Sequence, residues 1–273
     1  MEFKIVTTFK DVIRKIDNID LSTLNDKARR HWEKNGNETI SFGMRLTQQA
    51  EERLPSNASL LVYYEGDSLP ENTSKVEFVP HCLDKVEQFK SISKHKWIEK
   101  KKTHYSYKID STIINRKHYD YEFDAVRFCH PPFALLDAID RVEERYLISM
   151  DADVNINKKI PEDFFPSLVE SKAHNYYLSR YPHKHMESGF IIWDTHHEHN
   201  DLWWSEYRKL YEDGEIYNLY EGWTDCHAFD YVNSKLKKEV NLETHHIASA
   251  QTHCVWEYSR LQKYMSHHKG IAI

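Results

Sequence analysis

The stretch Arg145-Tyr-Leu-Ile-Ser-Met-Asp-Ala-Asp-Val154 decides the fold, because an apolar segment ends abruptly in two carboxylates separated by one residue. Its apolar residues are typical of a strand covered on both faces, as in a parallel sheet. In open α/β sheets ligands bind just beyond the carboxyl ends of the strands, which is where Asp151 and Asp153 would lie. Paired carboxylates suit Mg²⁺ or Mn²⁺, ions that typically bridge to nucleotide phosphates. The stretch therefore predicts a metal and phosphate site at a sheet edge.

Strand-like and helix-like segments alternate along the rest of the chain. This alternation predicts an α/β fold with a mostly parallel central sheet and helices on both faces. The 273 residues contain no Gly/Ser/Pro-rich linker and no internal repeat, so we expect a single domain over residues 1–273. The expected strands are 4–9, 60–64, 76–79, 146–150, 175–178 and 187–193, and the expected helices run from Pro131 or Pro132 through Val142, around 203–210 and around 229–236.

Composition excludes several classes of function. The net charge of -6 argues against general nucleic-acid binding, which needs a basic face. No apolar run approaches the roughly 20 residues that span a bilayer, so we expect no transmembrane segment and a cytoplasmic location. The cysteines Cys82, Cys129, Cys226 and Cys254 form no Cys-x-x-Cys pair, and reduced thiols are the expectation.

Residues 81–123 are the hardest part to interpret. Lys90 to Lys108 contains seven lysines against one acid, Glu99. This run is either a solvated helix or loop, or a surface that binds an anionic acceptor. Aromatic residues follow at positions 105, 107, 119, 121 and 123, partly in alternation. They fit a strand or hairpin, and they would equally suit stacking on an acceptor sugar.

Around Asp151-Ala152-Asp153 the chain resembles the nucleotide-sugar-dependent glycosyltransferases of the GT-A fold. Four further elements occur in that family's order: Lys4-Ile-Val-Thr-Thr-Phe9, Arg127-Phe-Cys-His-Pro-Pro-Phe133, Glu187-Ser-Gly-Phe-Ile-Ile-Trp193 and His267-His-Lys-Gly270. The resemblance implies a hexosyltransferase-like enzyme with a nucleoside-diphosphate-sugar donor, here a UDP-sugar, a carbohydrate or other hydroxyl acceptor, and Mn²⁺ or Mg²⁺. It assigns residues 1–80 to nucleotide binding, 81–123 to a variable, acceptor-facing segment, and 124–273 to the metal, donor sugar and acceptor.

The resemblance also implies three metal ligands. Asp151 and Asp153 would bind the ion, and the family adds a histidine near the C-terminus. His267 stands three residues before Gly270, a spacing seen in retaining members, while His268 is the adjacent competitor. The lysine and Pro-Trp pair that follow this glycine in the retaining pattern do not occur here.

The donor-binding positions follow from the same resemblance. The end of the first strand marks the nucleotide base, a carboxylate after the second strand would accept a base N–H, and glycine in the 187–189 loop permits close approach to the donor sugar. Each of three positions has a plain structural alternative. Glu65 could belong to an ordinary Glu-Gly-Asp turn, Arg127 could form a surface salt bridge, and Lys269 could be an exposed residue of the tail. The positions implied are Thr7, Thr8, Phe9, Glu65, Arg127, Asp151, Ala152, Asp153, Ser188, Gly189, Lys269 and Gly270.

Two carboxylates are the candidates for catalysis. Glu187 would hydrogen-bond a sugar hydroxyl or the acceptor. Asp225 resembles an acidic position that is the base of many inverting members and a sugar contact in retaining ones. A plain helix N-cap is its structural alternative. Only an inverting enzyme needs a base to deprotonate the acceptor, and the His-x-x-Gly spacing slightly favours retention.

Two other functions remain open at this stage. A nucleotidyltransferase that acts on sugar phosphates would share the sheet and the aspartates, but it needs a Gly-rich phosphate loop, and Thr7-Thr-Phe-Lys10 has no glycine. A noncatalytic carbohydrate- or nucleotide-binding module is suggested by 17 tyrosines and seven tryptophans. Donor hydrolysis separates this module from an enzyme.

Overall fold

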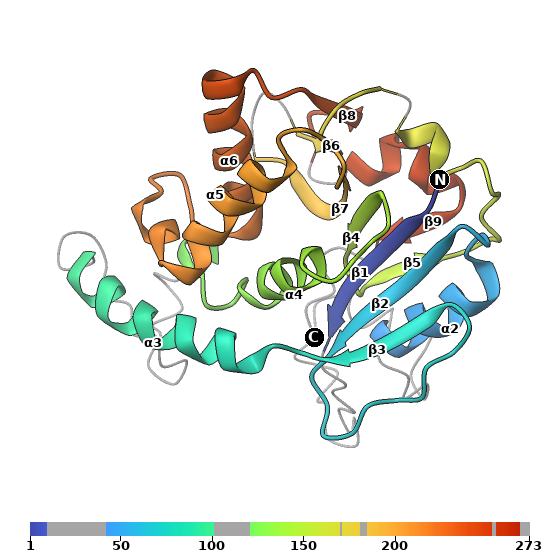
Figure 1. The fold of residues 1–273 in the computed structure, drawn as a ribbon, viewed down its shortest axis with the longest axis horizontal. Coiled ribbons are helices and arrows are strands. Elements are labelled where there is room, and N and C mark those ends of the chain that lie inside the picture. Colours follow the sequence, from blue (N-terminus) through green and yellow to red (C-terminus); the bar gives the residue numbers. More distant parts are fainter. Residues whose placement is uncertain (10–41, 101–120, 170, 181–184, 253–254, 268–273) are drawn as a thin grey trace, which may run out of the picture.

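A seven-stranded sheet forms the centre of the computed structural model, with the strand order β3-β2-β1-β4-β7-β6-β8 (Figure 1). The structure describes residues 1–9, 42–100, 121–169, 171–180, 185–252 and 255–267. Only β7 runs antiparallel to its neighbours in this sheet, and the predicted mostly parallel α/β fold is confirmed. The strands are β1 (Phe3–Phe9), β2 (Ala58–Tyr64), β3 (Val76–Pro80), β4 (Tyr146–Met150), β6 (Asn175–Ser179), β7 (Glu187–Asp194) and β8 (Thr244–Ser249).

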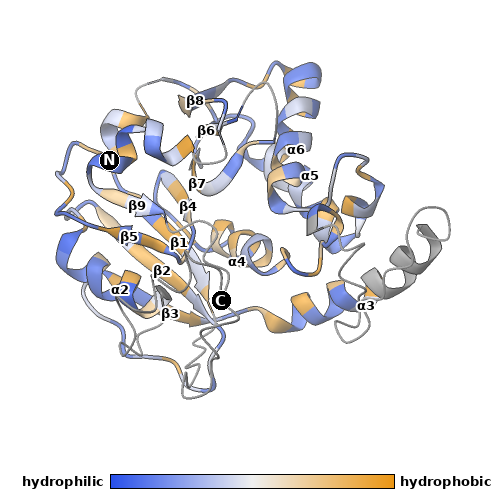
Figure 2. Ribbon diagram, turned by 180° about the vertical axis from the view of Figure 1, so that it is seen from behind, coloured by the Kyte–Doolittle hydropathy of each residue, from blue (hydrophilic) through white to orange (hydrophobic). Residues whose placement is uncertain are grey.

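Helices cover both faces of the sheet. Successive strand residues point to opposite faces, so Ile5 and Ile148 pack on the α2 side while Val6 and Leu147 pack beneath α4, α5 and α6. Figure 2 shows hydrophobic colour along the central strands and hydrophilic colour on the outside of α2. The helices are α2 (Phe42–Arg53), α3 (Leu83–Lys100), α4 (His130–Ile139), α5 (Asn200–Glu212) and α6 (Asp225–Val240); the 3₁₀ turns are η4 (Tyr121–Phe123), η5 (Pro166–Leu168), η6 (Glu215–Asn218), η7 (Val255–Tyr258) and η8 (Arg260–Lys263).

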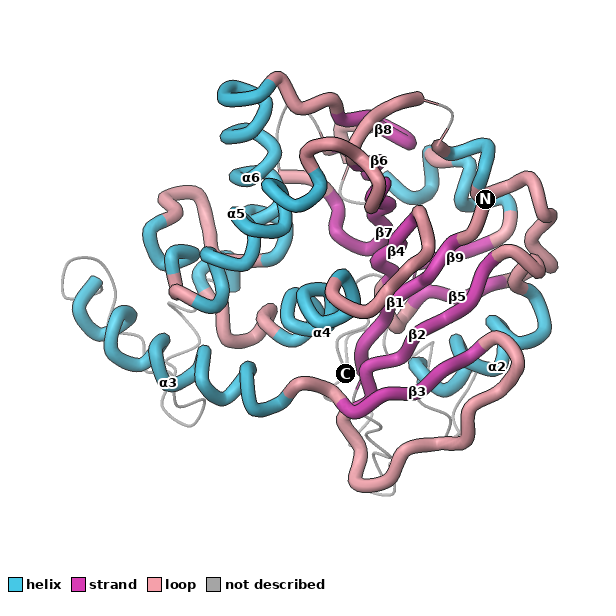
Figure 3. The backbone as a smooth tube through the Cα atoms, in the orientation of Figure 1, coloured by secondary structure: helices cyan, strands magenta, loops and turns pink. Residues whose placement is uncertain are grey.

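A second, two-stranded sheet lies beside the central one (Figure 3). Its strands, β5 (Val154–Ile156) and β9 (Met265–His267), run antiparallel, with Val154 opposite His267. Since β5 begins directly after Asp153, this pairing carries a residue from near the end of the chain to the acidic turn that follows β4.

Residues 83–142 agree with one expectation and correct two others. The lysines from Lys90 to Lys100 lie on a helix, one of the forms expected for that run. Residues 83–100 form helix α3, because Val86 and Phe89 are buried at helical spacing and the Phe89 ring packs against Phe133 of α4 and Tyr211 of α5. The strand or hairpin expected from the aromatic alternation falls mostly on 101–120, outside the described residues, and 121–123 form a 3₁₀ turn. Helix α4 ends at Ile139, so Val142 lies beyond it although its N–H still donates to the Ala138 carbonyl. No helix in the described part of the chain is both long and apolar enough to cross a membrane.

Candidate metal and nucleotide site

Three of the predicted ligands meet at the carboxyl end of β4. His267 Nε2 lies 3.2 Å from Asp151 Oδ2 and 3.0 Å from Asp153 Oδ1. The aspartates occupy the turn between β4 and β5, and the register of β5 with β9 brings the histidine to them. The His267 side chain is only 2% exposed, whereas those of Asp151 and Asp153 are 40% and 36% exposed. The imidazole is therefore the buried side of a site whose carboxylates face solvent.

The donor atoms of this group fit a divalent cation. The three ligand atoms lie within 4.8 Å of one another. Two carboxylate oxygens suit Mg²⁺ or Mn²⁺, and imidazole nitrogen is a ligand for many first-row metals. Burial opposes protonation of His267, but hydrogen bonds with Asp151, Asp153 and Glu187 outweigh it and raise its pKa to about 11. Without an ion, His267 thus holds a proton between the carboxylates, and a cation must displace this proton.

Glu187 lies against His267, and its side chain is fully buried. Its Oε1 is 3.3 Å from His267 Nδ1, its Oε2 accepts the Val255 N–H at 3.0 Å, and Arg180 forms an ion pair with it at 3.5 Å. We expected Glu187 to contact a sugar hydroxyl or the acceptor, but its side chain is 0% exposed. Its observed contacts fix the His267 ring, as carboxylates commonly do for histidines that bind a metal.

Gly189 is needed for the same cluster to form. A Cβ at this position would lie 2.7 Å from His267 Cε1 and 3.1 Å from Asp151 Oδ2. Contacts below 3.0 Å require a neighbour to move, and here that neighbour is the ring of His267, a residue held by strand pairing. The close backbone approach expected at Gly189 is therefore real, but the groups that approach it are His267 and Asp151.

Asp225 is the first residue of α6, and the N-cap is Thr224. Burial, and next the charge of Asp151, raise the pKa of Asp225, while a hydrogen bond with the Ser188 side chain lowers it. The Asp225 carboxylate also accepts the Cys226 N–H at 2.9 Å. The structure thus brings Asp225 and Ser188 together and within the electrostatic reach of the acidic turn.

The end of β1 faces a cavity that reaches the acidic turn. Thr7 and Thr8 line it together with Asp151, Ala152 and other residues of β4 and α4. Among the described residues, neither threonine hydroxyl has a hydrogen-bond partner. Phe9 instead places its ring in the core against Tyr64, so its side chain is not part of this cavity lining.

The remaining predicted positions lie apart or outside the described residues. Glu65 follows β2, and its carboxylate lies 2.7 Å from His130 Nδ1. Arg127 is exposed in the turn before α4, with its guanidinium over the Phe128 ring. The predicted positions His268, Lys269 and Gly270 lie outside the described residues.

Comparison with protein-family models finds no match, and neither does comparison with curated protein sequences. Among solved structures, the chain is similar to mouse xyloside xylosyltransferase 1, with 10% identity and a TM-score of 0.46 over 91% of this chain and 86% of that one. It is similar to the galactosyltransferase LgtC in complex with donor and acceptor sugar analogs, with 9% identity and a TM-score of 0.45 over 98% and 87% of the chains. For GlyE of Streptococcus pneumoniae TIGR4 the identity is 10% and the TM-score 0.41, over 90% of this chain but 45% of that chain. Their printed names describe a xylosyltransferase, a galactosyltransferase and a glycosyltransferase.

Proposed function

We propose that this protein is a metal-dependent glycosyltransferase that moves a sugar from a nucleoside-diphosphate sugar, specifically a UDP-sugar, to a hydroxyl acceptor. The observation that carries the proposal is the convergence of Asp151, Asp153 and His267 at the carboxyl end of β4. Ligands of open α/β sheets bind at this edge. The threonine-lined cavity extends from the same acidic turn to the end of β1.

Each part of the site has a chemical task in this reaction. A divalent cation held there would offset the negative charge that builds on the departing diphosphate. Asp151 and Asp153 would bind the ion, while His267 adds a nitrogen ligand from the buried side. The hydroxyls of Thr7 and Thr8 would donate to the nucleotide at the end of β1. Glu187 orients His267, and Gly189 leaves the ligands room to meet.

We assign Asp225 to the donor sugar and favour retention of anomeric configuration. Its carboxylate is held by the Cys226 N–H and the Ser188 side chain, beside the loop that the resemblance assigns to the donor sugar, and the His-x-x-Gly spacing favours retention. Asp225→Asn should then mainly raise the donor KM, whereas loss of a general base would lower transfer by about 10²-fold or more. An NMR spectrum of the product's anomeric proton tests the assignment, and an inverted product would overturn it.

The proposed location is the cytoplasm. All three described cysteines, Cys82, Cys129 and Cys226, are free. Free thiols are usual in a reducing compartment.

Donor hydrolysis tests the proposed function most directly. Purified protein is incubated with a panel of UDP-sugars, with Mn²⁺ or with EDTA, and free sugar and UDP are measured. We expect metal-dependent release that Asp153→Asn abolishes and that Asp201→Asn, an exposed acid on α5, leaves unchanged. Intact donors would favour a binding module. In a parallel reaction with added pyrophosphate, formation of UTP and a sugar phosphate in place of UDP would favour a nucleotidyltransferase.

A further inference from the structure

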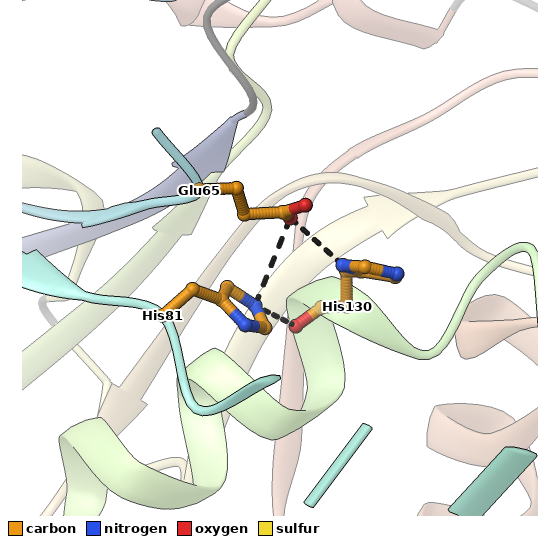
Figure 4. Close-up of side chains that lie close together, drawn as sticks. All are labelled: Glu65, His81 and His130. Carbon is orange, nitrogen blue, oxygen red and sulfur yellow. Dashed lines mark hydrogen bonds and ion pairs between the residues drawn. The ribbon is translucent and has the colours of Figure 1, made fainter. Parts of the chain in front are cut away.

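A second group of potential ligands lies at the same sheet edge, at the ends of other elements. Glu65 directly follows β2, His81 directly follows β3, and His130 begins α4. Figure 4 shows the three side chains pointing toward one another. Glu65 Oε1 lies 2.7 Å from His130 Nδ1 and 4.0 Å from His81 Nε2. One ligand atom from each residue lies within 4.8 Å of the other two.

The backbone and the packing hold this group in place. The His81 N–H donates to the Tyr64 carbonyl, and the Glu65 N–H donates to the Phe9 carbonyl. The His81 ring packs edge-on against Tyr63 and lies 5.3 Å from the His130 ring. The exposed fraction is 0% for the His81 side chain, 13% for Glu65 and 26% for His130. The group therefore has a buried side at His81 and an open side at His130.

We propose that Glu65, His81 and His130 form a binding site for a transition-metal cation of the zinc class, separate from the acidic turn. Two imidazole nitrogens and one carboxylate oxygen are a common zinc donor set, and sites with three protein ligands leave the fourth position open. Zinc–ligand bonds of about 2.0–2.1 Å in tetrahedral geometry place donor atoms about 3.3 Å apart. The observed separations of 2.7 and 4.0 Å bracket this value, so small side-chain movements close the site.

The donor atoms distinguish this site from the first one. Asp151, Asp153 and His267 offer two hard oxygens and one nitrogen, whereas this group offers two nitrogens and one oxygen. Nitrogen donors shift preference away from Mg²⁺ and toward Zn²⁺. Binding at His81 Nε2 replaces its present hydrogen bond with the His130 carbonyl, and the ring proton moves to Nδ1.

Metal titration of the whole chain tests the proposal without any nucleotide or activity. The parent protein is Asp151→Asn/Asp153→Asn, stripped with EDTA, so that the first site is silenced. Co²⁺ is added while its visible absorption is followed, because four-coordinate Co²⁺ absorbs strongly, and Zn²⁺ is then added to displace it. We expect one tightly bound ion per chain.

Ligand variants in this parent show where the ion binds. Glu65→Gln and His130→Gln change partly exposed residues and should each weaken Co²⁺ and Zn²⁺ binding by more than about tenfold. His196→Ala is the matched control, because His196 is exposed and lies outside both ligand groups. Thermal melts of the metal-free variants check that they fold.

Two results would overturn the proposal. One is the absence of a tight ion in the parent protein, which would leave the group as a hydrogen-bonded cluster only. The other is unchanged affinity in both Gln variants, which would place the ion on other histidines. An anomalous-scattering map of zinc-soaked wild-type crystals gives an answer independent of the variants. The proposal requires a zinc peak between Glu65 and His130, and a map without that peak would contradict it.

Discussion

Replacing Glu187 by Gln should separate the orientation of a metal ligand from the charge around it. Glu187 uses both carboxylate oxygens, one toward His267 Nδ1 and one for the Val255 N–H. Glutamine keeps the shape but offers a single acceptor oxygen. Either the His267 Nδ1–H or the Val255 N–H must therefore face the amide NH₂ group. In the first case the His267 ring loses the acceptor that fixes its position, and in the second case the hydrogen bond between β7 and η7 is lost.

Two opposed contributions set the change in Mn²⁺ affinity that we expect for Glu187→Gln. Loss of a ligand's hydrogen-bond partner typically weakens metal binding by about 10–100-fold, or about 1.4–2.7 kcal/mol. Against this, Glu187 helps raise the pKa of His267, so its neutralisation makes the competing proton easier to displace. Asp151 and Asp153 contribute more to that raised pKa and remain in place. Lost orientation should therefore dominate, and the Kd for Mn²⁺ should rise about tenfold or more.

The Glu187→Gln variant should also lose stability because of Arg180, so a second variant is needed to separate stability from Mn²⁺ affinity. Arg180 is 6% exposed and pairs with Glu187, so Glu187→Gln leaves a buried charge without its carboxylate. Such a loss costs about 3–5 kcal/mol of stability. The double variant Arg180→Gln/Glu187→Gln removes both charges and should recover much of that stability, but it should not recover Mn²⁺ affinity. Urea unfolding measures the stability of each variant.

The Mn²⁺ affinity is obtained without any turnover by measuring free Mn²⁺ with electron paramagnetic resonance. Glu206→Gln is the matched control, because Glu206 is a similarly buried carboxylate paired with Lys209 and Lys235 on α5 and α6. It should lower stability and leave the Mn²⁺ affinity unchanged. If Glu187→Gln binds Mn²⁺ within twofold of the wild type while Asp153→Asn does not bind it, the orienting role of Glu187 is wrong.

Three further outcomes are expected. Gly189→Ala should weaken Mn²⁺ binding in the same resonance assay while thermal melting stays cooperative, because its Cβ meets His267 Cε1 at 2.7 Å; unchanged affinity would show that the ring moves freely. The pKa of His267 is raised to about 11, so Mn²⁺ should displace one proton when it binds at neutral pH. The affinity of the protein for Mn²⁺ should then rise about tenfold per pH unit from pH 6 to 8. Calorimetry in buffers of different ionisation enthalpy counts the released proton, and a count of zero would contradict this. Burial raises the pKa of Asp230 to about 7, so between pH 5 and 7 the folded state holds a proton that the unfolded state has lost. The free energy of unfolding should therefore fall by about 2 kcal/mol over this range. Asp230→Asn should flatten that dependence in urea titrations, and an equally steep profile would exclude Asp230 as its source.

The sequence predicted those features that depend on neighbouring residues. The strand before Asp151 and the turn that follows it are local, and both occur where expected. The parallel sheet followed from alternating periodicities, which each element carries by itself. Glu187 shows the limit of this approach, because its position at the start of β7 was predicted correctly but its burial was not foreseen. Its partners Arg180, Val255 and His267 lie on other elements, and no spacing in the sequence reveals their burial.

His81 and His130 were missed for a related reason, although one signal was available. Glu65 and His81 are the first residues after two strands, β2 and β3, that are adjacent and parallel. Parallel neighbours end at the same edge of a sheet, so polar residues in these two positions are expected to approach each other. The order of the strands had to be known before that inference was possible. His130 adds the start of a helix, whose direction depends on packing rather than on its own sequence.

The electrostatics of the acidic turn give the strongest reason to expect a cation there. Asp151, Asp153 and Glu187 surround a single imidazole, and the charge of Asp151 also raises the pKa of Asp225. One proton on His267 offsets only part of this negative charge. Carboxylates this close repel one another, and the Arg180 guanidinium beside Glu187 relieves part of that repulsion. A divalent cation offsets more charge than the proton does, and strained titratable groups of this kind cluster where function requires them. The contacts that hold the proton on His267 are therefore the contacts that would select the metal.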